Sequence, residues 1–174
     1  MNPEEALKKR FQAEIRKAGE KGEKADNTIW IAVAANAGLG VVPLGINLWT
    51  FVGVNTLMVT FLSQIYDYNL SNEDAAKVIR QIFGAVGWTW MASVLGLKFF
   101  AEVLKGAGVI TFGGTTVAGM ALDATLAGAV TYALGYTSKD FFARGKRMSK
   151  TDLEKAFKTK FAEGKQAVKR QQRQ

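Results

Sequence analysis

The middle of the chain is hydrophobic, and the charged residues gather towards its two ends. Residues 29–66 hold no charged side chain, and residues 107–135 hold only one, Asp123. Near each end, apolar residues recur every four positions among charged ones: Leu7, Phe11 and Ile15, and later Leu153, Phe157 and Phe161. Such spacing is typical of an amphipathic helix. The pattern therefore predicts an apolar helical block between two charged amphipathic helices.

The uncharged segment 29–66 is interrupted in its first third by residues that break helices. They are Gly38, Gly40, Pro43 and Gly45, and a proline within a helix loses a hydrogen bond. We predict a helical hairpin that turns at Gly40, Pro43 and Gly45, with limbs over 29–42 and 46–66. The first limb would be about 21 Å long, which is shorter than a hydrocarbon core of about 30 Å. The hairpin is therefore either spanning or re-entrant.

A second hairpin is predicted from residue 71 onward. Ser71 and Asp74 have the spacing of a capping box, which predicts a helix from there to about Leu104. A fourth helix is expected over 107–135, long enough to cross a bilayer with some tilt. Small residues lie on all its sides and permit close helix packing; the packing positions that we expect are Gly114, Gly119 and Gly128.

Together these elements predict an all-α fold: a membrane helical bundle of two hydrophobic helical hairpins, flanked by N- and C-terminal amphipathic helices. Residues 1–27 would form the first amphipathic helix and a linker over 19–27. Residues 28–138 would form the membrane domain, and residues 139–174 the last helix and tail. The two end helices are expected to pair. Aromatic residues would lie at one membrane boundary: Trp30, Tyr66, Tyr68, Tyr132 and Tyr136.

The net charge of +8 comes almost wholly from residues 139–174, which hold twelve Lys or Arg against four acidic residues. Such a tail suits an anionic membrane surface, with about 1 kcal/mol of attraction per nearby basic residue. Nucleic acid is the other usual partner of a basic segment, but the apolar block favours the membrane. We expect Arg144, Lys146, Arg147 and Lys150 to contact lipid headgroups, and we expect no nucleic acid.

Several kinds of chemistry find no support in the sequence. The chain has no cysteine and no histidine, which excludes disulfides, thiolate metal sites and histidine-based catalysis. The glycine-rich stretches 38–40 and 113–116 lack the GxxxxGK[ST] phosphate-loop pattern. We therefore expect no enzyme activity, no cofactor and no metal site. The charged first 25 residues do not resemble a signal peptide, so the N-terminus is expected in the cytoplasm.

Asp123 and Asn47 are the candidate polar residues within the membrane. A carboxylate at the middle of a membrane helix costs about 3 kcal/mol on insertion scales, which makes a functional role the first hypothesis. Three interpretations of Asp123 stay open. In the first, nearby threonines, Lys98 or Asn47 pair with it structurally. In the second, it belongs to an ion or proton path. In the third, the bundle is soluble and Asp123 is simply in contact with water.

Three separated phrases carry a resemblance to a known family. They are VPLGIN at 42–47, QIYDYNLS at 64–71, and TYALG at 131–135 followed by Asp140-Phe141-Phe142 and Gly145. Over roughly residues 28–164 the chain resembles the bacterial family called domain of unknown function 697. Where family members often carry an acid after the proline turn, this chain has Asn47. The resemblance implies a membrane-associated helical domain without enzyme activity that works with an Era-like small GTPase, here acting in trans.

Three functions follow as expectations. The first is an anchor, scaffold or oligomeric assembly for a GTPase-linked process, embedded in the bacterial cytoplasmic (inner) membrane with both termini cytoplasmic. Its partners would be a bilayer with anionic lipids, further copies of the chain and a small GTPase. The second is an oligomeric channel or transporter that uses Asp123. The third is a soluble helical bundle that inserts its hairpins into membranes.

Overall fold

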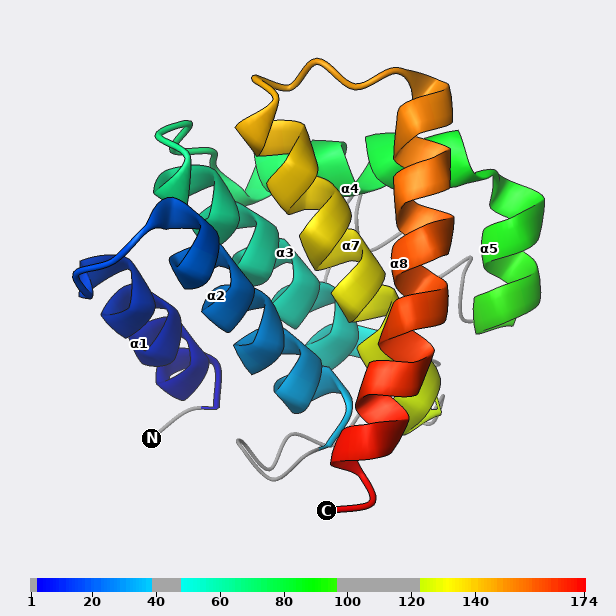
Figure 1. Cartoon of the computed structure of the whole chain (residues 1–174), viewed down its shortest axis with the longest axis horizontal. Coiled ribbons are helices and arrows are strands. Elements are labelled where there is room, and N and C mark those ends of the chain that lie inside the picture. The colour runs from blue at the N-terminus through cyan, green and yellow to red at the C-terminus, as the bar shows by residue number, and fades with distance from the viewer. Residues whose placement is uncertain (1–2, 39–47, 97–122) are drawn as a thin grey trace, which may run out of the picture.

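The computed structural model describes residues 3–38, 48–96 and 123–174, and all regular secondary structure in these ranges is helical. The expected all-α class is therefore confirmed for this part of the chain. The helices are α1 (Pro3–Arg16), α2 (Lys21–Asn36), α3 (Leu48–Ile65), α4 (Asn72–Val86), α5 (Trp88–Leu95), α7 (Ala124–Ala143) and α8 (Lys150–Gln171) (Figure 1).

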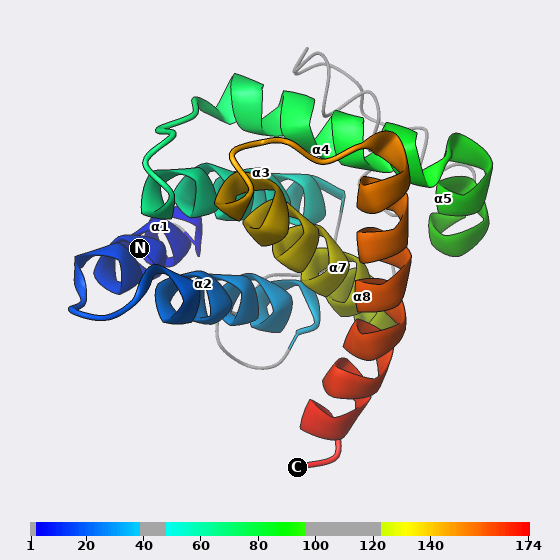
Figure 2. The same ribbon diagram turned by 45° about the horizontal axis from the view of Figure 1, so that its top comes forward.

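Helix α7 lies at the centre of the bundle. It packs against α8, α2, α3 and α4, and it passes between the α2–α3 pair and α8 in both ribbon views (Figures 1 and 2). Fully buried side chains from several helices fill the core, among them Ile29, Met58, Ile82 and Leu134. The core is thus built mainly around α7.

The apolar stripes of the two end helices face this core. Leu7 and Phe11 of α1 are buried, and so are Leu153, Phe157 and Phe161 of α8. The expected pairing of the two end helices is nevertheless wrong. Helix α1 packs on α2 and α3, whereas α8 packs on α7 and α4, and α1 and α8 lie at opposite sides of the bundle (Figures 1 and 2). A four-residue stripe fixes which face of a helix is buried, not the neighbour that covers it.

The two limbs of the first hairpin are helices α2 and α3, but the first limb begins and ends earlier than the predicted 29–42. Helix α2 starts at Lys21, so the linker predicted over 19–27 is wrong. Side chains of α2 contact the end of α1. The Lys24 ammonium donates to the Ile15 carbonyl at 3.1 Å, and the Asn27 amide donates to the Glu14 carboxylate at 3.1 Å. Helix α2 ends at Asn36, and Gly38 has φ +66°, where a break was predicted. Helices α2 and α3 pack together.

The helix predicted from residue 71 to about Leu104 is wrong as one continuous element. It starts as expected, because the Ser71 hydroxyl accepts from the Asp74 amide at 3.1 Å. It ends at Val86, since Gly87 has φ +99°, and α5 leaves at 98° to α4. The turn brings Trp90 of α5 against α8, where its ring centroid lies 5.3 Å from that of Phe161. Residues 97–104 lie outside the described residues.

The continuous helix predicted over 107–135 is wrong at Asp123. The backbone there is not helical (φ −54°, ψ 130°), and α7 begins at the next residue and runs on to Ala143. The Asp123 carboxylate accepts a hydrogen bond from the Leu126 amide at 2.9 Å. Aspartate is a preferred residue at this position, because its side chain satisfies a free backbone donor of the first turn.

By length and composition, no single helix among the described residues could cross a membrane. The bent pair α4–α5 passes the same criterion when its two helices are taken together.

Candidate functional site

Three aromatic side chains of α2 and α7 meet on one side of the bundle. Trp30 packs edge-on against Tyr132, with ring centroids 5.7 Å apart, and Tyr132 lies 4.5 Å from Tyr136, one turn further along α7. All three are half-buried. Two lysines border these rings, Lys139 of α7 and Lys160 of α8. We call these five residues the aromatic–lysine cluster.

A glycine of α8 lets this cluster form. A Cβ atom at Gly164 would lie 2.9 Å from the Cβ of Tyr132, closer than real Cβ contacts. Gly164 therefore permits α8 to lie directly on the tyrosine. On another side of α7, a Cβ at Gly135 would lie 2.8 Å from Ile29 Cγ1, so glycine also brings α2 close. The tyrosines are held at the junction of three helices.

The lysines place positive charge beside the aromatic rings. Lys160 Nζ lies 5.4 Å and Lys139 Nζ 5.6 Å from the Tyr136 ring centroid, within cation–π range. Lys139 also pairs with Asp26 of α2 at 2.5 Å. Burial, followed by the negative charge of Asp26, raises the pKa of Tyr136 well above its ordinary value. The Tyr136 phenol therefore keeps its proton to a higher pH than an ordinary tyrosine does.

This arrangement suits the boundary between an apolar phase and water. Tryptophan and tyrosine rings have an apolar body and a polar tip, and lysine has an apolar stem that ends in a charge. Residues of this kind gather at membrane–water interfaces. The structure brings three of the five expected boundary aromatics together, Trp30, Tyr132 and Tyr136.

Tyr68 belongs to a second group, beside the connection between α7 and α8. Its ring lies 5.5 Å from Phe142, and Lys146 Nζ lies 5.0 Å from the Tyr68 ring centroid. The four basic residues expected at the membrane surface gather on this connection and at the start of α8: Arg144, Lys146, Arg147 and Lys150. All four are exposed, and among the described residues none forms a salt bridge.

The other predicted site residues fall in three places. Asp123 is exposed at the start of α7 and its carboxylate serves as the helix cap. Gly128 lies where α7 meets α2 and α8, since a Cβ there would be 2.9 Å from both Ala37 Cβ and Val168 Cγ2. The rest lie outside the described residues: Gly40, Pro43, Gly45, Asn47, Gly114 and Gly119.

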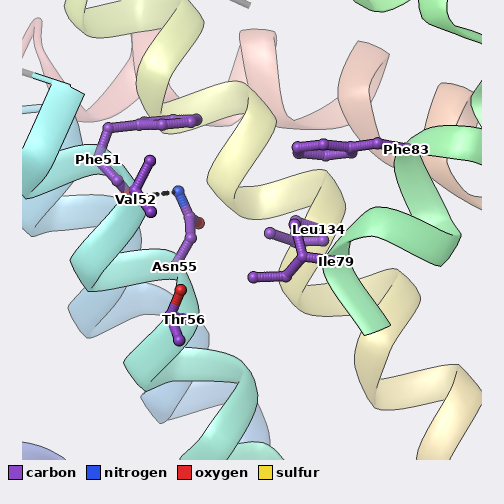
Figure 3. Close-up of a pocket in the computed structure, with 7 residues that line it drawn as sticks. All are labelled: Phe51, Val52, Asn55, Thr56, Ile79, Phe83 and Leu134. Carbon is purple, nitrogen blue, oxygen red and sulfur yellow. Dashed lines mark hydrogen bonds between the residues drawn. The ribbon is translucent and has the colours of Figure 1, made fainter. Parts of the chain in front are cut away.

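Buried polar side chains join α2 to α7. The Asn36 amide donates to the Thr131 hydroxyl at 2.8 Å, and both side chains are fully buried. Asn36 thus forms a hydrogen bond between two helices, as is expected of an asparagine in an apolar helix. Asn55 differs, because its amide donates to the Phe51 carbonyl of its own helix at 2.8 Å (Figure 3).

Asn55 also borders a small pocket between α3, α4 and α7 (Figure 3). The lining is mostly apolar and consists of Phe51, Val52, Asn55, Thr56, Ile79, Phe83 and Leu134. Its free interior is about that of one water molecule. Asn55 Oδ1 is buried and has no hydrogen-bond partner in the described part of the chain. A pocket of this size is too small for an organic ligand.

The comparisons with known proteins identify the family alone. Neither the curated proteins nor the solved structures include a match to this chain. The family model described as "Domain of unknown function (DUF697)" matches residues 4–166. This match begins in α1 and ends within α8, so it includes the first amphipathic helix that the sequence resemblance left out. The chain therefore belongs to the DUF697 family.

Proposed function

We propose that this chain is a membrane-associated helical module, embedded in the bacterial cytoplasmic membrane, that acts as an anchor or scaffold for a GTPase-linked process. A small GTPase in trans and further copies of the chain are its proposed partners. The GTPase is proposed on the family resemblance alone. The membrane role has support from the chemistry of the outward-facing residues.

The supporting observation is that the partly exposed positions of α3, and those of α2 beyond Asn27, carry no charge. The partly exposed positions of α2 beyond Asn27 include Trp30, Ile31 and Ala34, and those of α3 include Val52 and Thr56. A helix that faces water normally has charged residues on its outer side, as α1, α4 and α8 do. An uncharged outer side suits contact with acyl chains.

The aromatic–lysine cluster borders this uncharged side. Trp30 belongs both to the outer side of α2 and to the cluster, whose lysines would reach the headgroups while the rings stay in the interface. The basic connection between α7 and α8 would lie on the cytoplasmic side, where anionic lipids attract Lys and Arg. These features support one orientation of the hairpin in the proposed membrane arrangement.

The test is membrane fractionation with a charge introduced on the uncharged side. The full chain should stay in the membrane pellet after a carbonate wash. The double variant Ile31→Lys/Ala34→Lys, at partly exposed positions of α2, should be released to a large extent, because each lysine costs up to about 3 kcal/mol in the hydrocarbon. The matched control, Gln12→Lys/Gln81→Lys, adds the same charge at exposed positions of α1 and α4 and should stay bound. Quantitative release of the wild-type chain would overturn the proposal.

A second candidate is a bundle that inserts its hairpins only on contact with a membrane. It is favoured by α1, whose buried Leu7 and Phe11 cover α2 and α3 and would have to leave them for full insertion. Purification without detergent discriminates between the two candidates. A monodisperse monomer would favour the inserting bundle, whereas a requirement for detergent would favour the embedded module.

A further inference from the structure

The outer face of α8 carries a row of basic residues. Lys155, Lys165, Lys169 and Arg170 of α8 are exposed, and so is Arg173, two residues beyond the end of the helix at Gln171. Lys155 and Lys169 are fourteen residues apart, so they lie on nearly one line along the helix. This line is about 21 Å long at 1.5 Å per residue. We call these five residues the basic face of α8.

The acidic residues of α8 are engaged elsewhere. The Asp152 carboxylate caps the helix and accepts from the Ser149 hydroxyl at 2.7 Å. Glu154 pairs with Lys158 at 2.7 Å, and Glu163 pairs with Lys160 at 2.8 Å. None of the five residues of the basic face forms a salt bridge within the described ranges. Glu163 is the exposed carboxylate nearest to this face, and it is paired with Lys160. The face therefore has an excess of positive charge, which is concentrated in its second half.

The basic face is held in a fixed orientation. Leu153, Phe157, Phe161 and Val168 are buried on the opposite side of α8, where the helix packs on α7 and α4. Aromatic side chains flank the helix. Trp90 lies against Phe161 and beneath Lys158, whose Nζ is 5.6 Å from the Trp90 ring centroid. Lys160 lies over Tyr136, and α5 runs beside α8 (Figure 1).

We propose that the basic face of α8 docks on the phosphate headgroups of anionic lipids, with α8 lying flat on the membrane surface. This inference rests on the membrane role proposed above and adds the surface that makes the electrostatic contact. A straight, rigid row of charges matches a plane of headgroups. The flanking aromatics favour lipid over nucleic acid, because tryptophan and tyrosine rings partition into the interface.

The experiment is vesicle flotation of the full chain. The probes are vesicles of phosphatidylcholine with phosphatidylglycerol, and vesicles of phosphatidylcholine alone. The variant Lys155→Gln/Lys165→Gln/Lys169→Gln should bind the anionic vesicles about 100-fold more weakly, from about a factor of five for each of the three basic residues removed. Its remaining binding should depend less on salt. Circular dichroism should report unchanged helicity, since all three positions are exposed.

The matched control removes the same charge from α1. Lys9, Arg10 and Arg16 are exposed and have no salt bridge in the described part of the chain, and their triple glutamine variant should bind like wild type. Equal losses in the two variants, or no loss in the α8 variant, would overturn the inference and leave the membrane role intact. If the α8 variant lost affinity for duplex DNA alone, nucleic acid would replace lipid as the partner. A wild-type chain that binds no vesicles would overturn both proposals.

Discussion

At the scale of single residues, glycines decide how closely the helices approach α7. Three glycines, Gly128, Gly135 and Gly164, have neighbours where a methyl group would have to lie. A sequence with many small residues indicates close helix contacts, but only the packing shows at which glycines a side chain would not fit. Gly128 is the clearest case, because its neighbours are a short side chain, Ala37, and the branched Val168.

Gly128→Ala should lower the free energy of unfolding by about 1–3 kcal/mol, because the added methyl group overpacks the contact of α7 with α2 and α8. Thermal or denaturant unfolding followed by circular dichroism measures this change. The control is Gly53→Ala in α3, where a Cβ has no atom within 4 Å. That substitution should raise stability by up to about 1 kcal/mol through helix propensity. Equal effects at the two positions would contradict the tight contact.

Tyr136 should make the fold sensitive to alkaline pH. Burial, and then the charge of Asp26, raises the pKa of Tyr136 above its ordinary value of 10.0. Since the unfolded chain releases this proton first, the stabilisation is fully present below about pH 10 and is lost as the pH rises through the folded pKa. Tyr136→Phe should therefore show a smaller loss of stability between pH 9 and 11. Tyr66 and Tyr132, whose pKa values are also raised, should account for the remaining loss.

At the scale of the elements, the ends of the helices determine the architecture. Serine or aspartate side chains start three of the described helices: Ser71 for α4, Asp123 for α7 and Ser149 for α8. The Ser71 start was visible in the sequence as a capping pattern. Asp123 was read as part of a longer apolar helix, because the apolar residues on both sides concealed its capping role.

Gly87→Ala should destabilise the chain by about 1–3 kcal/mol, because Gly87 has φ +99° and ψ 130°, a backbone conformation that costs a residue with a side chain that much. Space is not the reason, since a Cβ there would meet no atom within 4 Å. Gly84→Ala, within α4, should instead be neutral or stabilising. If both variants were equally stable, the turn between α4 and α5 would not depend on the glycine backbone.

At the scale of the whole molecule, α7 holds the bundle together. Helix α7 contacts α2, α3, α4 and α8, whereas α5 packs against α4 and α8 through few residues, Trp90 among them. Stability within a fold is uneven, and segments with many buried contacts open last. The amides of α7 should therefore exchange with deuterium more slowly than those of α5 and α1.

Hydrogen–deuterium exchange with mass spectrometry can order the helices directly. Peptides from the second half of α7 should retain their amide hydrogens longest, and peptides from α5 should lose them early. Peptides from α1, which covers one side of the bundle, should exchange before those of α2 and α3. Equal protection of α5 and α7 would show that the bundle does not depend on its central helix.

The sequence by itself determined that the chain is helical and which faces of the end helices are buried. The four-residue stripes at Leu7 and Leu153, the break at Gly38 and the start at Ser71 follow from local chemistry, because periodicity and capping act over a few neighbouring residues. The family was also accessible from short phrases of sequence. The exposed basic residues Arg144 to Lys150 could be expected for the same reason, since a run of charges stays in contact with water or headgroups.

Tertiary structure alone decided which helices meet. The separation of α1 from α8 depends on contacts between residues distant in the chain, which no local pattern records. The turn at Gly87 and the start of α7 at Asp123 have local causes, a glycine with φ +99° and a carboxylate that caps the Leu126 amide, but the surrounding apolar residues concealed them. The aromatic–lysine cluster also depends on contacts between distant residues, because Trp30, Tyr132 and Lys160 come from three helices. Their meeting depends on Gly164 and Gly135 leaving room for close packing, a steric condition that exists only once the helices are assembled.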